Sequence, residues 1–132
     1  MRPIPWGFDS GYDSRVARYL KQPDHLEIEP MLYAITLNYI RPVDEIESHL
    51  DTHRDWLIEH TRQGRILVAG PLEPRTGGFV LATCENRAEL DAMLENDSFY
   101  VHKLVDYTVV AATPALRAGD FPAQWAPDAK AV

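Results

Sequence analysis

The chain has 132 residues, of which 45% are hydrophobic and 25% are charged. This length predicts one domain, and this composition excludes wholesale disorder. Its 20 acidic residues outnumber its 13 lysines and arginines, which gives a net charge of −7 with neutral histidines. An acidic chain without a basic cluster argues against a nucleic-acid partner and against an anionic membrane surface.

Three zones of the chain differ in pattern. Residues 1–30 contain four prolines and no sustained hydrophobic period, so we expect an N-terminal extension with, at most, a short helix from Asp13 to Lys21. Residues 31–113 are densely patterned and predict one α/β domain. Residues 114–132 contain three prolines and several alanines, which favours a C-terminal tail.

The first half of the patterned zone predicts a strand followed by a helix. Met31 to Ile40 is rich in the aromatic and branched residues that suit a pleated surface. Asp44 would begin a helix, with Glu47 as its capping-box partner, and Gly64 would end it. The residues that then share one face of this helix are Ile46, Leu50, His53 and Leu57.

The second half predicts two strands, a helix and a last strand. The strands Arg65–Ala69 and Phe79–Cys84 would be joined by a hairpin loop. Asn86 would cap the second helix, and residues 97–100 mark its end or a tight break. Leu104 to Ala112 forms the last strand, so the predicted order is βαββαβ.

Both faces of the predicted sheet carry apolar residues. In the first strand, Leu32 and Ile40 would face one way, and a row that begins with Tyr33 and Ile35 would face the other. Two helices can shield only one face, and burial returns about 25 cal/mol per Å² of apolar surface. We therefore expect the second face to be covered by a two-fold homodimer or, alternatively, by residues 1–30.

Several segments together carry a resemblance to a known family. The segments, in chain order, are Met31–Ile35, Thr52–Leu57, Gly64–Leu72, Gly77-Gly78 and Glu95–Phe99. Their order and spacing resemble those of the YciI-like (YCII-related) proteins over residues 31–113. The resemblance implies an α+β, ferredoxin-like βαββαβ fold of the dimeric α/β-barrel superfamily.

The same resemblance implies an acid–base site. Members of the family are thought to use a His–Asp pair in a pocket between helices and sheet, and one characterised type removes chloride from a chlorinated hydroxyhydroquinone. The matching motifs make the catalytic pair His53 and Asp97 here. The family usually has proline after this aspartate, whereas this chain has Ser98, which adds a hydroxyl group to the site.

The position of His53 suits proton transfer without reference to any family. Burial on an apolar helical face lowers a histidine's pKa and a nearby carboxylate raises it, so the imidazole can exchange protons near neutral pH. A core histidine bonded to a backbone carbonyl is the alternative for His53. For Asp97 the alternative is a cap at a helix end.

Candidate substrate-binding residues surround this pair in the sequence. They are Tyr33, Arg41, Gly70, Pro71, Ser98 and Phe99. Tyr33, Phe99, and also Tyr39 and Tyr100, could line a pocket for a small cyclic molecule, although core packing explains aromatic residues equally well. Gly70-Pro71 could equally be a plain turn, and Arg41 could be solvated rather than contact an anionic substrate.

We expect neither a metal nor a nucleotide cofactor. His49 and His53 are four residues apart, a spacing that can bind zinc, but the H-E-x-x-H pattern and a cysteine pair are absent. Rossmann and Walker motifs are also absent. The lone Cys84 permits no internal disulfide, and we expect it to pack as a small hydrophobe.

The chain contains no apolar stretch of membrane-spanning length, and its first six residues lack the apolar core of a secretory signal. We therefore expect a cytoplasmic protein with no membrane partner. Three functions stay open: a cofactor-independent enzyme acting on a small cyclic substrate by elimination, isomerisation or dehydrochlorination; a non-catalytic small-molecule binding or accessory protein; and an assembly module.

Overall fold

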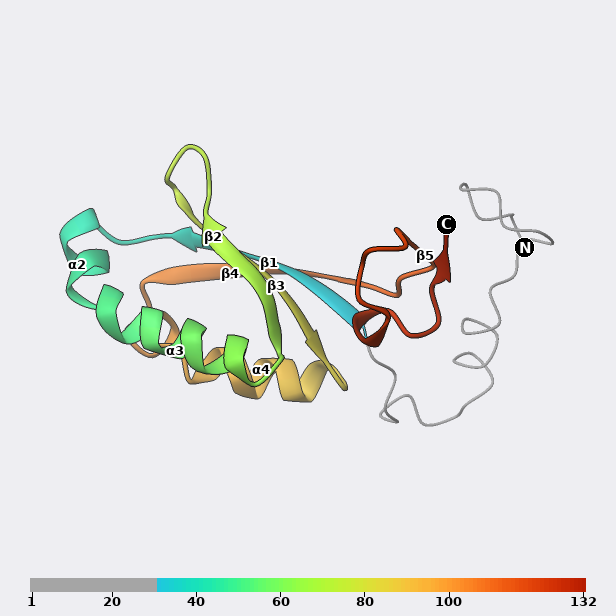
Figure 1. Ribbon diagram of the computed structural model, residues 1–132. Helices are drawn as coiled ribbons and strands as arrows, with labels where there is room; N and C mark the ends of the chain where they lie inside the picture. The colour runs from blue at the N-terminus through green and yellow to red at the C-terminus, as the bar shows by residue number, and fades with distance from the viewer. Residues whose placement is uncertain (1–30) are drawn as a thin grey trace, which may run out of the picture.

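The computed structural model describes residues 31–132, and Figure 1 shows a sheet with its helices packed on one side. The predicted N-terminal extension and the helix from Asp13 to Lys21 lie outside the described residues. The observed order of the main elements is the predicted βαββαβ, except that each of the two predicted helical segments consists of two helices. The predicted α+β, ferredoxin-like fold is confirmed.

The main sheet has four strands, all paired in antiparallel fashion in the order β2-β3-β1-β4. The strands are β1 (Met31–Tyr39), β2 (Ile66–Pro71), β3 (Gly77–Cys84) and β4 (Val105–Ala112). Ile35 in β1 lies opposite Val80 of β3 and Val109 of β4. Because directly paired residues share a face, this register fixes which side chains point to the helices.

The first helical layer differs from the prediction in two respects. It consists of α2 (Val43–Ser48) and α3 (Leu50–Arg62), with a break at His49, rather than one helix from Asp44. The N-cap residue is Pro42, which has no side-chain cap bond, so the predicted Asp44–Glu47 capping box does not form. The Pro42 carbonyl accepts the first backbone hydrogen bonds of the helix, from the N–H groups of Glu45 and Ile46, so the helix begins at Val43. Gly64 follows the helix with φ +82°, as a helix stop requires.

The second helical layer consists of α4 (Arg87–Glu95) and α5 (Ser98–Val101). The predicted cap is confirmed, because Asn86 Oδ1 accepts a hydrogen bond of 2.9 Å from the backbone N–H of Glu89. The Glu89 carboxylate accepts a second bond from the Glu85 N–H. Asp97 is the N-cap of α5, so the tight break predicted at residues 97–100 is the start of a short helix.

The core lies between the helices and the face of the sheet on which they pack, and Figure 1 shows the helices on that side. The Trp56 indole N–H of α3 donates a 2.9 Å hydrogen bond to the Met93 carbonyl of α4 and so joins the two helical layers. No helix within residues 31–132 covers the opposite face of the sheet, where Val68 and Val110 are 56% and 59% exposed. No helix in the described part of the chain is both long and apolar enough to cross a membrane.

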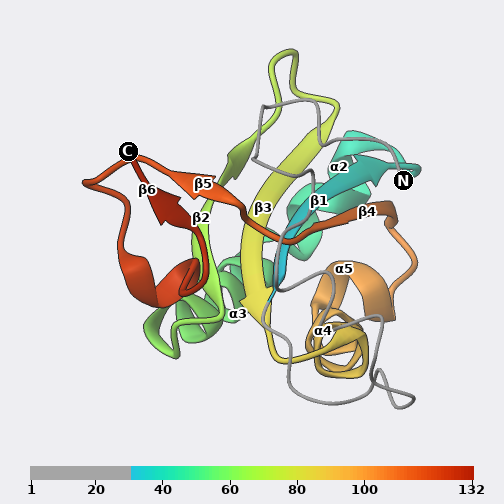
Figure 2. The same ribbon diagram turned by 90° about the vertical axis from the view of Figure 1, so that its right-hand side faces the viewer.

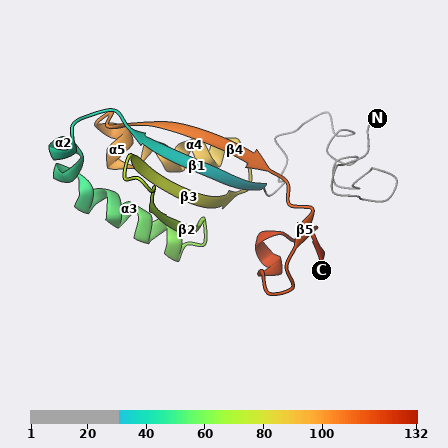
Figure 3. The same cartoon turned by 90° about the horizontal axis from the view of Figure 1, so that it is seen from above.

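Residues 114–132 contain some regular structure. The strands β5 (Leu116–Arg117) and β6 (Lys130–Ala131) pair in parallel, and the 3-10 helix η2 (Ala123–Trp125) lies between them in sequence. Figure 2 shows β5 and β6 side by side, and both Figure 1 and Figure 3 place the segment beyond the end of the main sheet. Arg117 Nη1 donates a 3.1 Å hydrogen bond to the Phe121 carbonyl and closes this segment on itself.

His60, near the end of α3, is a buried histidine outside the predicted site. It is 5% exposed, its ring lies 5.3 Å from that of Trp56, and its Nδ1 has no hydrogen-bond partner within the described residues. Burial and then the positive charge of Arg65 lower the pKa of His60. Both effects disfavour the imidazolium form.

We expect this histidine to make the protein less stable in mild acid. The unfolded chain protonates His60 near its ordinary pKa of about 6.5, whereas the folded chain does so only at lower pH. Its contribution to stability is therefore complete above that pH and is lost as the pH falls toward the folded-state value. Urea unfolding at pH 7.5 and 5.5 should show a smaller loss for His60→Phe than for the wild type. Equal losses would contradict this account.

Candidate active site

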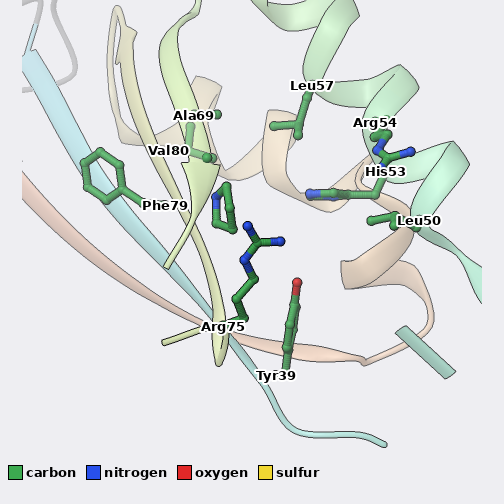
Figure 4. Close-up of a pocket in the computed structure, with 11 residues that line it drawn as sticks. Tyr39, Leu50, His53, Arg54, Leu57, Ala69, Arg75, Phe79 and Val80 are labelled. Carbon is green, nitrogen blue, oxygen red and sulfur yellow. The ribbon is translucent and has the colours of Figure 1, made fainter. Parts of the chain in front are cut away.

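A cavity of about 260 Å³ opens between α3 and the β2–β3 hairpin. Figure 4 shows the side chains that surround it. The helix supplies Leu50, His53, Arg54 and Leu57; the end of β1 supplies Tyr39; and the hairpin supplies Ala69, Gly70, Pro71, Arg75, Phe79 and Val80. The Phe79 ring points away from the cavity, so this residue contributes mainly backbone. A cavity of about 150 Å³ is enough to hold benzene, so a substituted ring fits here.

His53 is held rigidly at the helical wall of this cavity. Its side chain is 11% exposed, and its ring stacks on Phe99 with centroids 3.9 Å apart and planes 3° from parallel. Nδ1 lies 2.8 Å from Asp97 Oδ1. Within the described residues Nε2 has no hydrogen-bond partner, and it is the ring nitrogen left for a molecule in the cavity.

Asp97 is fully buried beneath His53 and accepts three hydrogen bonds. Its Oδ1 accepts from the Phe99 backbone N–H at 3.1 Å as well as facing His53, and its Oδ2 accepts from the Tyr107 hydroxyl at 2.8 Å. An ionised carboxylate can only accept hydrogen bonds, so with Asp97 ionised and His53 neutral the hydrogen lies on Nδ1 and Nε2 keeps a lone pair. This tautomer is the one that a general base facing the cavity requires.

Tyr107 of β4 completes the network from the sheet side. Burial, followed by the negative charge of Asp97 and the hydrogen bond to it, raises the pKa of Tyr107. The phenol therefore keeps its proton and remains a donor to Asp97. Tyr107 faces the helices from β4, but strand periodicity does not reveal that its hydroxyl meets a carboxylate 10 residues earlier in the chain.

We expect Tyr107→Phe to shift the pH–rate profile rather than to abolish turnover. Removing the hydroxyl leaves Asp97 with one donor fewer, so the carboxylate holds a His53 imidazolium more strongly and the acidic limb of the pH–rate profile moves to higher pH. The stability cost should be about 1–3 kcal/mol, as expected for loss of one buried hydrogen bond. A variant that loses stability without any shift of the pH profile would make Tyr107 a purely structural residue.

The structure brings together some of the predicted binding residues. Gly70 and Pro71 line the cavity from the hairpin. Phe99 is 1% exposed and lies under the His53 ring rather than in the cavity wall. The Ser98 hydroxyl accepts a 2.8 Å hydrogen bond from Thr52 Oγ1 and donates to the His49 carbonyl, so it joins α5 to the start of α3.

Three further predicted residues lie outside the cavity lining. Tyr33 is 2% exposed in the core beside Ala82, whereas Tyr39, a second candidate on the same face of β1 but at its other end, lines the cavity. Periodicity identifies the face that a strand residue occupies, but not its distance from a pocket along the strand. Arg41 forms an exposed ion pair of 3.0 Å with Glu45, so it is the solvated arginine of the alternative interpretation and does not reach the cavity. Tyr100 is 45% exposed and is also outside the cavity lining.

Sequence reasoning missed two cationic residues of the cavity. Arg54 follows His53 on α3, and Arg75 lies in the connection between β2 and β3. The adjacency of Arg54 to His53 is a usable signal, because neighbouring residues at a helix edge can border the same cavity. Arg75 carries no such signal, since the path of a loop is not given by periodicity.

The histidines do not converge on a metal position. His49 stacks on His102 with ring centroids 3.8 Å apart, whereas His53 is bonded to Asp97. Residues 31–132 contain no group of three or more His, Cys, Asp or Glu side chains placed to hold a metal ion. Cys84 is buried, and burial followed by the negative charge of Glu89 raises its pKa to about 12, so it remains an unreactive thiol.

A family model described as the YCII-related domain matches residues 31–113. The chain belongs to the YCII-related family. The matched segment of this YCII-related protein contains all of the main sheet, together with His53 and Asp97. The resemblance inferred from the motifs is thus confirmed.

One solved structure supports the fold of this YCII-related chain. It is the 5-chloro-2-hydroxyhydroquinone dehydrochlorinase TftG from Burkholderia phenoliruptrix AC1100, in complex with 2,5-dihydroxybenzoquinone. The two chains are 21% identical with a TM-score of 0.53, and the similarity covers 66% of this chain and 96% of the other. Among curated proteins, none matches this chain.

Proposed function

We propose that this protein is a cofactor-independent enzyme that performs proton-transfer chemistry on a small cyclic substrate. The observation that supports the proposal is the 2.8 Å contact between His53 and a fully buried carboxylate at the wall of a cavity. His53 is the proposed general base and acid, and Asp97 is the proposed positioning residue. The reaction class is an elimination, an isomerisation or a dehydrochlorination.

The tautomer of His53 sets the direction of proton transfer. Nε2 takes a proton from a carbon or oxygen of the bound ring, and Asp97 stabilises the imidazolium that forms. In a dehydrochlorination, chloride leaves a tetrahedral carbon of a ring tautomer with the electrons of the C–Cl bond, while the electron pair of the broken C–H or O–H bond moves into the ring and forms a new C=C or C=O bond. The proton then passes from Nε2 to water, so the net products are the dehydrochlorinated ring, a proton and chloride.

The direct test offers the wild-type protein a chlorinated hydroxyhydroquinone, the compound class in the name of the structural neighbour. Chloride release is followed by ion chromatography, and an unsaturated cyclic lactone, whose double bond migrates when one proton is moved, is supplied in parallel to detect isomerisation. We expect turnover of one class. Thermal stabilisation by these compounds without any product would favour the alternative function, a non-catalytic binding or accessory protein.

We also propose that the chain forms a homodimer through the open face of its sheet. The register places Leu32, Phe79, Leu81 and Val110 on that face. The helices lie on the other side of the sheet (Figure 1), so no helix within residues 31–132 covers this face, and a two-fold partner would supply a covering layer.

Light scattering should therefore give about twice the 15.0 kDa chain mass. Leu81→Arg should give monomers. Val101→Arg, at an exposed position of α5, should leave the dimer intact. A monomeric wild type would favour coverage by residues 1–30, and a chain beginning at Met31 would then self-associate.

A further inference from the structure

The charge of the cavity lining is opposite to that of the whole protein. The chain carries a net charge of −7, yet the lining contains Arg54 and Arg75 and no acidic residue. Asp97 lies behind His53, outside the lining, with its oxygens already bonded. A positively charged cavity in a negatively charged protein attracts and concentrates anionic ligands.

Neither guanidinium group is committed to a strong contact within the protein. Arg54 has no hydrogen-bond or ion-pair partner within residues 31–132. Arg75 Nε lies 3.7 Å from Glu73 Oε2, but both side chains are about three-quarters exposed, at 74% and 77%. An exposed pair at this distance is screened by water and holds its arginine weakly.

Arg75 borders the cavity from the hairpin, opposite the wall of α3 that carries Arg54 and His53. Figure 4 shows Arg75 extending from the hairpin toward the cavity, and Arg54 and His53 on the helix. Leu50, Leu57 and Val80 supply apolar surface around the same space. A flat ring held between these apolar side chains can present a charged oxygen to the guanidinium groups while another of its edges faces Nε2.

We infer that this cavity selects small cyclic compounds that carry an ionised oxygen, such as a carboxylate or phenolate, and that Arg54 and Arg75 are the residues that recognise it. The inference rests on the proposed function in that it concerns the substrate of the same site. Guanidinium groups suit this role because they are always charged and donate paired hydrogen bonds to such oxygens.

Isothermal titration calorimetry with two matched probes tests the inference. The probes are 2,5-dihydroxybenzoate and 2,5-dihydroxybenzamide, which share a ring and differ in one charge. The wild type should bind the carboxylate about 10- to 100-fold more tightly, the usual value of charge-assisted hydrogen bonds. Arg54→Gln and Arg75→Gln should each reduce this preference, and the double variant should remove it.

Arg62→Gln is the matched control, because it removes the same charge from the same helix but lies outside the cavity lining. It should retain the wild-type preference. Equal binding of the two probes by the wild type, including no measurable binding of either, overturns the inference, as does a preference that survives in the double variant.

The outcome is separable from that of the proposed function. Selective binding of the carboxylate without turnover of any cyclic compound would retain the inference and reject the enzyme. Turnover of a cyclic compound without a preference for the charged probe would retain the proposed enzyme and reject the inference about the arginines.

Discussion

Replacing His53 with asparagine should lower turnover by about 10²- to 10⁴-fold, the usual contribution of one positioned acid–base group. The asparagine amide can donate to Asp97 from nearly the position of Nδ1, so the buried carboxylate keeps a partner. No basic nitrogen then faces the cavity. Initial rates with the substrate that the wild type converts measure the effect.

The matched control for this substitution is His102→Asn, which changes an exposed histidine outside the cavity lining. It should retain wild-type rates. His53→Ala should lose turnover to a similar degree while keeping the fold, although Phe99 and Asp97 each lose a contact. Full activity in a folded His53→Asn or His53→Ala protein would remove the proposed mechanism.

Replacing Asp97 with alanine should cost about 3–5 kcal/mol in the free energy of unfolding, the range seen when one member of a buried charged network is removed. The substitution leaves the Tyr107 hydroxyl, the Phe99 N–H and His53 Nδ1 without their acceptor. It also removes the N-cap of α5. Urea unfolding monitored by circular dichroism measures the loss.

Asp97→Asn separates stability from catalysis at the same position. Its side-chain oxygen can still cap α5, but the negative charge that stabilises an imidazolium is gone, so turnover should fall more steeply than stability. Glu95→Ala removes an exposed carboxylate at the end of α4. It should change the free energy of unfolding by no more than about 0.5 kcal/mol and should leave turnover unchanged. An Asp97→Ala protein as stable as Glu95→Ala would contradict the network described here.

The parts of the fold that periodicity controls could be predicted from the sequence. The strand and helix order follows from apolar spacing, and the Asn86 cap follows from local hydrogen-bond chemistry. The break at His49 could not be predicted, because residues on both sides continue the same helical face. The expectation of one continuous helix that begins at Asp44 was therefore wrong in its first residue and in its continuity.

The candidate site was predictable only where a motif or a neighbouring residue signals it. Family motifs gave the His53–Asp97 pair, and the structure places these side chains within hydrogen-bond distance. The contribution of Tyr107 depends on the register of β4 and on the position of α5, which both come from tertiary packing. The same limitation explains why the sequence makes both Tyr33 and Tyr39 candidates, although only Tyr39 lines the cavity.

Arg75, a proposed recognition residue, lies on a different part of the fold from the proposed proton-transfer pair. His53 and Asp97 are held by helices, an aromatic stack and a buried network, whereas Arg75 lies in the connection between β2 and β3. Substitutions or insertions in that connection leave the helical contacts of the pair intact. If the proposed roles hold, changes in one surface loop can alter which compounds bind without rebuilding the buried His53–Asp97 pair.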